Sequence, residues 1–170
     1  RMDARSTFEE ILSQVERFNA DPLVHGILVQ LPLPDSSMEE AVIETIRPEK
    51  DVDGFHPINV GRMVLGLPCY LPCTPHGILH MLKRAGVETC GSHVVVVGRS
   101  HIVGRPLAIL LSQKNAFGNA TVTVCHTKTR DIAAFTRQAD IVVVAAGRAH
   151  TLDGAMIREG AAVIDVGVNR

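Results

Sequence analysis

A glycine turn follows a run of valines in the second half of the chain. Residues 94–97 lead into Gly98-Arg99-Ser100, and Gly104 comes four residues after the serine. A phosphate group binds where a turn without a Cβ is followed by a helix whose free amides and dipole face the anion. Ser100 stands where a second glycine is usual, and Gly104 is one residue late for the G-x-G-x-x-G pattern. The turn predicts a nucleotide-phosphate site; a purely structural turn is the alternative.

The segment after the next predicted strand carries positive charges and hydroxyl groups but no carboxylate. Residues 126–130 read His, Thr, Lys, Thr and Arg. A site for NAD usually places an Asp or Glu here, which accepts hydrogen bonds from the ribose 2′-hydroxyl. A basic segment instead attracts a 2′-phosphate, and Arg99 beside the glycine turn offers a second, bidentate contact. The sequence therefore favours NADP over NAD, with a solvated basic loop as the alternative.

Two further strand ends carry glycine at the same predicted edge of the sheet. Gly147 follows a strand that ends near Ala145, and Gly167 follows one that ends near Val166. A glycine lets the backbone approach a ligand closely at the carboxyl end of a strand. Each position is equally consistent with an ordinary turn.

A polar residue enters a proline-rich loop in the first half of the chain. Gln30 ends an apolar run and is followed by Leu31-Pro32-Leu33-Pro34. Proline lacks the amide donor that a sheet needs and fixes its own φ, so the loop is rigid and holds a polar tip in place. Gln30 is therefore a candidate substrate contact; a simple edge turn accounts for the loop equally well.

Two carboxylates lie two residues apart in the segment Lys50-Asp51-Val52-Asp53-Gly54. In an extended segment both would share one face and could anchor an amidine or an amino-pyrimidine edge. A helix-capping turn is the alternative. A calcium site is not expected, because no further oxygen ligands follow at EF-hand spacing.

Cysteine and histidine residues gather between positions 69 and 80. His76 and His80 lie one helical turn apart and could converge, and Cys69 and Cys73 precede them. No Glu stands between the histidines as it does in H-E-x-x-H, and the cysteines straddle a proline-rich bend. We therefore predict no metal site. The sequence has no G-x-S-x-G elbow, which argues against a covalent hydrolase.

The elements that would position these residues begin to alternate after about residue 72. Near-continuous valine runs separated by helical patterns are typical of a parallel sheet covered on both faces. The sequence predicts an α/β fold: a Rossmann-like doubly wound parallel sheet, preceded by part of a smaller α/β domain. The predicted strands are 24–30, 94–97, 121–125, 141–145 and 162–166. The predicted helices are 8–18 capped by Ser6 or Thr7, 38–46, 77–84 behind a Thr74-Pro75 cap and ended by Gly86, 103–115 and 131–138.

The amino-acid composition limits the classes of protein to which the chain can belong. The 170 residues are 46% hydrophobic and 21% charged, with a formal net charge of −1, the balance of a soluble globular protein. This charge favours neither nucleic acid nor an anionic membrane as a partner, and no apolar run approaches the ~20 residues that span a bilayer. The N-terminal residues form no secretory signal, and the four cysteines show no disulfide pattern. We expect reduced cysteines and a cytoplasmic location.

Five motifs together resemble the bifunctional methylenetetrahydrofolate dehydrogenase/methenyltetrahydrofolate cyclohydrolase family, in the family's order and over essentially the whole chain. They are Val29-Gln30-Leu31-Pro32-Leu33-Pro34, Lys50-Asp51-Val52-Asp53-Gly54-Phe55, Pro72-Cys73-Thr74-Pro75, Val97-Gly98-Arg99-Ser100-His101-Ile102-Val103-Gly104-Arg105-Pro106 and Asp165-Val166-Gly167-Val168-Asn169. The resemblance implies NADP-linked oxidation of methylenetetrahydrofolate to methenyltetrahydrofolate, then hydrolysis to formyltetrahydrofolate, in one-carbon metabolism and purine biosynthesis. It also implies a homodimer joined through the nucleotide domains.

The resemblance implies an active site in a cleft between an N-terminal folate-side domain and the nucleotide domain, with the folate held by residues of the first half of the chain. Gln30, with Leu31 and Pro32, would lie near the reacting one-carbon unit. Asp53 would grip the pterin ring. Gln30 and Asp53 are thus the implied catalytic residues.

The resemblance places NADP on the second half of the chain. Arg99, Ser100 and Thr127 would hold its phosphates. Gly167 and Val168 would meet the nicotinamide carboxamide. The full set of implied cofactor-binding residues is Thr74, Gly98, Arg99, Ser100, Ile102, Val103, His126, Thr127, Gly147, Gly167 and Val168.

The sequence departs from the family's pattern at both ends. The family's Tyr-x-x-x-Lys motif, whose lysine is central to the cyclohydrolase step, is missing, because Tyr70 is followed by Thr74 at the lysine position. The downstream Pro-Gly-Gly-Val-Gly-Pro-Met-Thr segment is missing too. We therefore expect residues 1–71 to be part of a folate-binding catalytic domain, 72–90 a linker helix and 91–170 a shortened NADP-binding domain, and the isolated chain to be catalytically impaired. Two alternatives stay open: a non-catalytic nucleotide-binding or dimerisation module, and a two-domain NADP dehydrogenase of shikimate type.

Overall fold

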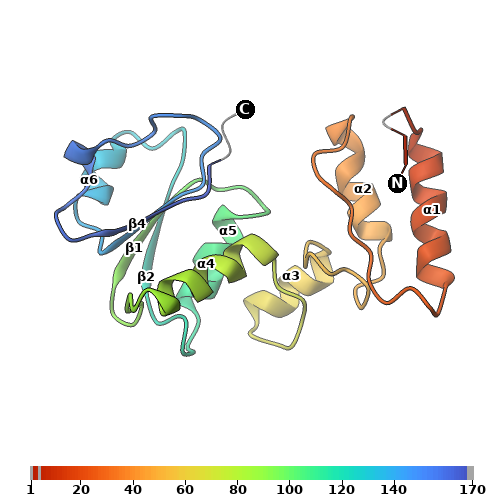
Figure 1. Cartoon of the computed structure of the whole chain (residues 1–170), viewed down its shortest axis with the longest axis horizontal. Helices are drawn as coiled ribbons and strands as arrows, with labels where there is room; N and C mark the ends of the chain where they lie inside the picture. Colours follow the sequence, from red (N-terminus) through yellow and green to blue (C-terminus); the bar gives the residue numbers. More distant parts are fainter. Residues whose placement is uncertain (1, 4, 168–170) are drawn as a thin grey trace. The chain divides into compact units, whose positions relative to one another are not determined.

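The structure is a computed structural model that describes residues 2–3 and 5–167. The chain forms two compact units, residues 1–71 and residues 72–170. The first unit contains α1, α2 and α3, and the second contains the sheet with α4, α5 and α6 (Figure 1). None of the described helices is long and apolar enough to cross a membrane.

Two helices of the first unit match the sequence prediction. The helix α1 (Phe8–Ala20) begins behind Thr7, whose hydroxyl accepts from the amide of Glu10 at 3.3 Å while the Glu10 carboxylate accepts from the amide of Thr7 at 2.8 Å. This capping box satisfies two amides that the first turn leaves free. The helix α2 (Glu39–Thr45) follows a short 3₁₀ turn, η1 (Ser36–Met38). The core between them consists of Val15, Ile27, Val42 and Ile46.

The predicted strand at residues 24–30 is wrong. Among the described residues only one parallel bridge forms there, between Ile27 and Asp51. Ile27 is buried, but the next residue, Leu28, is 61% exposed. A strand needs a partner along its length, and here the partner segment pairs at a single residue before it turns away. The apolar run is therefore an extended segment fixed at one point.

One helix of the first unit was missed from the sequence. The helix α3 (Pro57–Val64) begins with a proline at its first position, and the Nδ1 atom of His56 accepts from the amide of Ile58 at 3.1 Å. A proline suits this position because its missing N–H would be unpaired anyway. Asn59 and Met63 form the buried face. The His-Pro pair was the available signal for this helix.

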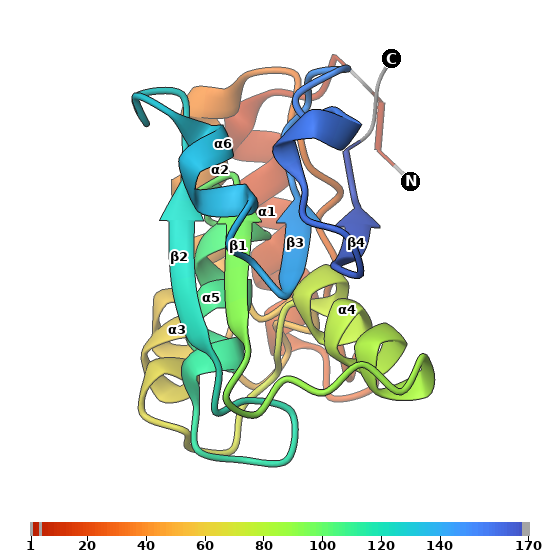
Figure 2. The ribbon, with the colours of Figure 1, turned by 90° about the vertical axis from the view of Figure 1, so that its left-hand side faces the viewer.

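The predicted parallel sheet of the second unit is confirmed. Its strands are β1 (His93–Val97), β2 (Thr121–Cys125), β3 (Ile141–Val144) and β4 (Ala162–Asp165). They lie in the order β2-β1-β3-β4, and every pair is parallel (Figure 2). Successive valines point to opposite faces, and both faces are covered, so the strands read as continuous apolar runs.

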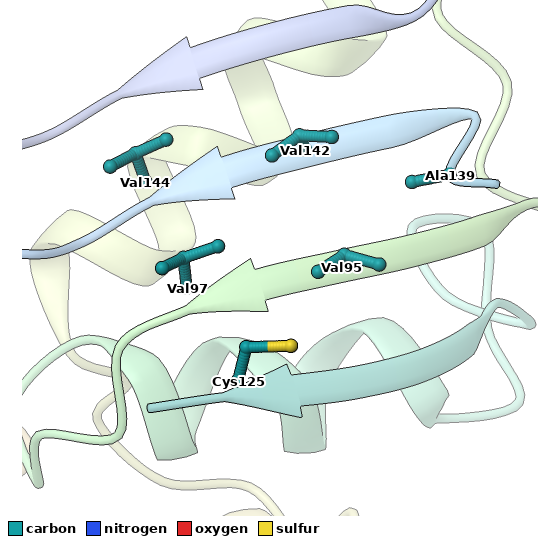
Figure 3. Close-up of a cluster of buried hydrophobic side chains, with 6 residues drawn as sticks. All are labelled: Val95, Val97, Cys125, Ala139, Val142 and Val144. Carbon is teal, nitrogen blue, oxygen red and sulfur yellow. The ribbon is translucent and has the colours of Figure 1, made fainter. Parts of the chain in front are cut away.

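Helices cover both faces of this sheet, as predicted. The helices α4 (Cys73–Arg84) and α5 (Gly104–Ser112) lie on one side, and α6 (Ile132–Thr136) lies on the other (Figure 2). On the α6 side the side chains of alternate strand residues form one apolar cluster (Figure 3). Its buried members are Val95, Val97, Cys125, Ala139, Val142 and Val144. The intervening residues Val94, Val96, Ile141 and Val143 are at most 1% exposed.

Three helix bounds differ from the prediction. Thr74 is not a cap: α4 already begins at Cys73, behind Pro72, which makes no side-chain capping hydrogen bond. The helix α5 ends at Ser112 because Gln113 is extended, and its carbonyl accepts from the amide of Asn119 at 2.8 Å. The helix α6 ends at Thr136, and a 3₁₀ turn, η2 (Gly154–Met156), lies between β3 and β4. Gly86 ends α4 as expected, with a φ of +70°.

Candidate functional site

The carboxyl ends of the four strands lie at one edge of the sheet. Val97 pairs with both Cys125 and Val144, and Val144 pairs with Asp165. From β1 the chain passes to β2 on one side and then returns to β3 on the other side. Ligands bind outside the strand ends at such a reversal of strand order. The segments after β1 and β3 therefore flank the candidate site of this unit.

Gly98 occupies the point between these strands where no side chain fits. Its amide donates to the carbonyl of Cys125 at 2.8 Å, and its φ is +134°. A Cβ at this position would lie 2.5 Å from the carbonyl oxygen of Ala145. Contact within the chain therefore requires glycine at this half-buried position, as the structural reading of the turn allows, and the phosphate site stays a prediction.

Gly104 holds the start of α5 against the turn. A Cβ here would lie 2.1 Å from the carbonyl oxygen of Gly98. No side chain can be accommodated at that distance from a backbone atom, so the helix begins in direct contact with the end of β1. Gly104 thus allows the helix to pack closely against the turn.

Ser100 takes the place of the second glycine of a dinucleotide fingerprint. Its hydroxyl oxygen accepts from the amides of Val103 at 3.1 Å and Gly104 at 3.3 Å. These are two of the amides that a phosphate would otherwise meet at the helix start. The hydroxyl retains its own hydrogen as a donor. Arg99 and Ile102, which flank the serine, are exposed.

A tight turn follows β2. The amide of His126 donates to the hydroxyl of Thr129 at 2.9 Å, and the amide of Thr129 donates to the carbonyl of His126 at 2.7 Å. The amide of Lys128 donates to Nδ1 of His126 at 3.2 Å, so Nδ1 is the unprotonated nitrogen and Nε2 carries the hydrogen in the neutral ring. Thr127 and Lys128 project from this turn as exposed residues.

The glycines after β3 and β4 differ from each other. A Cβ at Gly167 would lie 2.6 Å from the carbonyl oxygen of Ala146, so contact within the chain already requires glycine there. The amide of Gly167 also donates to the carboxylate of Asp165 at 2.8 Å. A Cβ at Gly147 would meet nothing within 4 Å. Val168, a predicted cofactor contact, lies outside the described residues.

Thr74 lies in the first turn of α4 and is exposed.

In the part of the chain that the structure describes, no group of three or more His, Cys, Asp or Glu side chains is arranged to hold a metal ion. All four cysteines are free, and burial raises the pKa of the Cys125 thiol. Cys125 packs in the core cluster of the sheet, and a buried thiol whose pKa is raised is not reactive.

In the first unit, the two predicted substrate segments meet at the single bridge. The amide of Ile27 donates to the carbonyl of Lys50 at 2.7 Å. Gln30 follows three residues after Ile27, and Asp53 follows three residues after Lys50. The structure thus brings the two segments together at this one bridge, after which the second segment turns.

Lys50 fixes this meeting point to the end of α1. Its ammonium donates to the carbonyls of Phe18 at 2.9 Å, Asn19 at 2.8 Å and Asp21 at 2.8 Å. All three ammonium hydrogens are used, at the helix end where the dipole favours positive charge. The side chain of Asn19 also donates to the carbonyl of Thr45, at the end of α2. Sequence reasoning missed both residues, because nothing in their spacing marks such contacts.

The paired aspartates do not share one exposed face, and that prediction is wrong. Asp51 is 2% exposed, and its carboxylate accepts from the amide of His56 at 2.8 Å and from the side-chain amide of Asn59 at 2.9 Å. The segment turns instead of staying extended, so the first carboxylate points into the protein and holds the start of α3. Only Asp53 remains available to a ligand.

Asp53 is half-buried at the tip of this turn. Burial raises the pKa of its carboxyl, and the nearby charge of Asp51 raises it further. The following residue, Gly54, has a φ of +68°, and a Cβ there would lie 2.5 Å from the carbonyl oxygen of Tyr70. The turn is therefore fixed on both sides of the free carboxyl.

Gln30 is exposed at the start of the proline-rich loop. Its side-chain amide donates to the carbonyl of Leu31 at 3.1 Å, and the Leu31–Pro32 peptide bond is cis. The amide of Leu33 donates to the carboxylate of Glu39 at 3.0 Å, which ties the loop to the first turn of α2. Leu31 is half-buried and Pro32 is exposed beside Gln30.

Known proteins match both units. Residues 72–170 match the tetrahydrofolate dehydrogenase/cyclohydrolase NAD(P)-binding domain, and residues 1–53 match the catalytic domain of the same family. The chain belongs to the tetrahydrofolate dehydrogenase/cyclohydrolase family. The resemblance predicted from the five motifs is thus confirmed.

Relatives within this dehydrogenase/cyclohydrolase family are similar over nearly the whole chain. The bifunctional protein FolD of Geobacillus thermodenitrificans is 60% identical over 162 residues, which are 95% of this chain and 56% of the relative. The FolD crystal structure from Campylobacter jejuni has a TM-score of 0.92 and 48% identity, covering 99% of this chain and 59% of that one. The FolD of Trypanosoma brucei, complexed with NADP and an inhibitor, has a TM-score of 0.89 and 44% identity, covering 98% of this chain and 56% of that one. The chain therefore spans less than two thirds of these relatives.

Proposed function

We propose that this chain supplies the central part of an enzyme that oxidises methylenetetrahydrofolate to methenyltetrahydrofolate with NADP and hydrolyses the product to formyltetrahydrofolate. One observation carries the proposal: the glycine turn after β1 lies at the reversal of strand order, with Arg99 exposed on it and an exposed basic turn after the neighbouring strand β2. A nucleotide phosphate fits such a place. The relatives that share the whole arrangement are dehydrogenases and cyclohydrolases.

NADP fits the residues at the strand ends. Arg99 and Thr127 are exposed on the two turns that follow β1 and β2, and Ser100 retains a hydroxyl hydrogen to donate. No carboxylate lies in the turn after β2 to repel a 2′-phosphate. NADP would accept the hydride that leaves the folate. The residues of this unit bind and orient it, with Gly147 and Gly167 following β3 and β4 at the same sheet edge.

The first unit would hold the folate. The half-buried carboxyl of Asp53 suits the amino-pyrimidine edge of a pterin, because a carboxylate accepts paired N–H groups. Gln30 would orient the one-carbon unit with its amide dipole, while Leu31 and Pro32 provide an apolar surface beside it. Lys50 and Asp51 keep both segments in place.

Further properties are proposed for the whole protein. It would act in the cytoplasm in one-carbon metabolism that supplies purine biosynthesis. It would form a homodimer through the second unit, whose edge strand β4 exposes 48% of Val163.

The first experiment measures nucleotide selectivity. Arg99→Ala should raise the dissociation constant of NADP by about 10- to 100-fold, the value of a charge-assisted contact, and leave that of NAD within about twofold. Arg84→Ala, which removes an exposed arginine at the end of α4, is the matched control and should change neither. Equal losses for both nucleotides would refute the 2′-phosphate contact.

The second experiment measures the reaction. The chain joined to the additional segments that its longer relatives have should reduce NADP in the presence of methylenetetrahydrofolate, and Asp53→Ala should raise the apparent folate constant without changing cofactor affinity. Cofactor binding without turnover, even with those segments, would identify a nucleotide-binding module instead. Loss of cofactor affinity in Asp53→Ala would show a structural role for this residue.

A further inference from the structure

Two histidines meet on an accessible face of α4, apart from every residue used above. His76 and His80 lie one helical turn apart, and their Nε2 atoms are 3.2 Å apart. The ring centroids are 4.6 Å apart, so the rings lean towards each other at their Nε2 ends. His80 is exposed and His76 is half-buried. The rings do meet, at a place where the sequence alone led us to predict no metal site.

We propose that His76 and His80 form a bidentate site for a divalent transition-metal ion of the class that prefers imidazole: Cu²⁺, Ni²⁺ or Zn²⁺. With metal–nitrogen bonds of about 2.0–2.1 Å, two nitrogens at the observed separation subtend roughly 100° at the metal, close to a tetrahedral angle. The separation therefore suits a chelate, with each ring turning so that its Nε2 lone pair points at the ion. Water would fill the remaining coordination positions. The site is independent of the proposed function.

The surroundings of His80 restrict its ring before any ion binds. The ring meets the edge of Phe117 with centroids 5.1 Å apart. Phe117 is itself covered by the ammonium of Lys83, 4.7 Å from its centroid, and its amide donates to the side chain of Asn115 at 2.8 Å. A ligand that is already ordered loses less side-chain entropy on binding. The positive charge of Lys83 repels a metal cation, and solvent screens this repulsion.

A hydrogen bond between two neutral imidazoles would also produce the short contact. In that case one Nε2 carries a hydrogen and the other accepts it. For a metal ion to bind both nitrogens, the ring that carries the Nε2 hydrogen would change to its other neutral tautomer, with the hydrogen on Nδ1, so that each Nε2 offers a lone pair to the ion. Cys73, exposed one turn before His76, is the nearest soft ligand on the helix, but the described residues hold no three-ligand group. The protein therefore supplies two ligands to the proposed site, the imidazole rings of His76 and His80.

Metal preference follows from the ligand chemistry. Imidazole pairs bind first-row divalent ions with affinities that rise from Mn²⁺ to Cu²⁺ and fall again at Zn²⁺. Mg²⁺ and Ca²⁺ prefer oxygen ligands and should not bind this pair. Selectivity for Cu²⁺ and Ni²⁺ over Mg²⁺ would distinguish this site from general cation binding by acidic surface groups.

The test is a calorimetric titration of the untagged chain with Ni²⁺ and Zn²⁺ at neutral pH. The highest-affinity site should bind one ion, and His76→Ala and His80→Ala should each weaken it at least tenfold. Both positions lie on an accessible helix face and alanine favours helix, so circular dichroism should show an unchanged fold. His25→Ala, at an exposed histidine of the first unit, and Cys73→Ser are the matched controls and should retain wild-type affinity.

A spectroscopic measurement identifies the bound atoms. Zn²⁺ should shift the ¹⁵N resonances of both Nε2 atoms together, at one equivalent. The proposal would be overturned if either alanine variant kept the wild-type metal affinity, or if the ¹⁵N resonance of only one ring shifted. The short contact would then be a hydrogen bond between the two imidazoles. Loss of binding in Cys73→Ser would overturn it too, because a thiolate would then hold the ion.

Discussion

The two units place their ligand-facing residues by different means. In the second unit, backbone geometry does it: four parallel strands end at one edge, and Gly98 and Gly104 allow their turns to touch. In the first unit, side chains do it: Lys50 and Asp51 hold two irregular segments through hydrogen bonds to backbone and to Asn59. Both arrangements fix a short exposed segment. They differ in what a substitution removes.

The comparison teaches where each unit is vulnerable. A regular sheet distributes its hydrogen bonds over many residues, so its sensitive positions are those where close packing leaves no room for a change, including glycines that cannot take a side chain. A side-chain network concentrates its hydrogen bonds on a few residues, so loss of one partner leaves buried polar groups unpaired. Four substitutions test this difference, from the largest expected effect to the smallest.

Gly104→Ala should cost the most. The added Cβ would lie 2.1 Å from a backbone oxygen, which forces α5 away from the end of β1. We expect a loss of about 3 kcal/mol in the free energy of unfolding, measured by urea denaturation. Gly147→Ala, where the Cβ meets nothing, should stay within about 0.5 kcal/mol of wild type. Equal midpoints for the two variants would contradict the close packing assigned to Gly104.

Asp51→Ala should cost slightly less, about 2–3 kcal/mol, because the amide of His56 and the side chain of Asn59 lose their buried acceptor. Amide hydrogen exchange at His56 should accelerate together with the loss of stability. Asp53→Ala is the matched control, two residues away and half-buried, and should leave that exchange rate unchanged. If both variants accelerate it equally, the two aspartates share one role.

Lys50→Met should cost about 1–2 kcal/mol. The three carbonyls at the end of α1 lose a charged donor, but water can reach them in part. The methionine keeps most of the apolar stem, so the measured loss reports the ammonium contacts. Lys128→Met, at an exposed lysine of the turn after β2, should have no measurable effect on urea denaturation. A comparable loss in the free energy of unfolding in both variants would show that positive charge in general stabilises the chain. The three hydrogen bonds of Lys50 would then have no particular role.

Asp53→Asn should change stability least, with a difference from wild type that develops across one pH window and persists above it. A carboxyl whose folded pKa is raised binds its proton more tightly in the folded chain. Its contribution is therefore present below the ordinary value of 3.8 and is lost as the pH rises through the folded pKa. Relative to Asp53→Asn, the wild-type chain should lose stability across that window in urea titrations at successive pH values. An opposite slope would mean that the Asp53 carboxylate is stabilised in the fold.

The sequence predicted the second unit well because its signals are local. Four valine-rich runs, with helical patterns between them, specify parallel strands covered on both faces, and the structure contains all four strands. Gly98 and Gly104 also stand where two backbone segments approach closely, which glycines at a strand end and at the following helix start can indicate, while their contact with a phosphate stays a prediction. Helix ends were less predictable: α5 ends at Ser112 because of a contact between Gln113 and Asn119, which no periodicity reveals.

The first unit shows why the rest could not be predicted. The apolar run at residues 24–30 has the composition of a strand, but the partner that would make it one pairs only at Asp51. The two aspartates look equivalent in sequence, and burial separates them into a structural residue and a free one. Lys50 reads as a solvated charge, although its ammonium meets three carbonyls that lie 29 to 32 positions away in the sequence. Such contacts depend on tertiary structure.

The close approach of Gly98 to Ala145 also limits how this protein can be engineered. No side chain can be introduced at that position, so a library aimed at ligand preference gains nothing from it. Arg99 and Lys128 are exposed on the neighbouring turns, so their substitution should not disturb the packed core. Randomising these two positions would therefore sample nucleotide selectivity at nearly constant yield of folded protein.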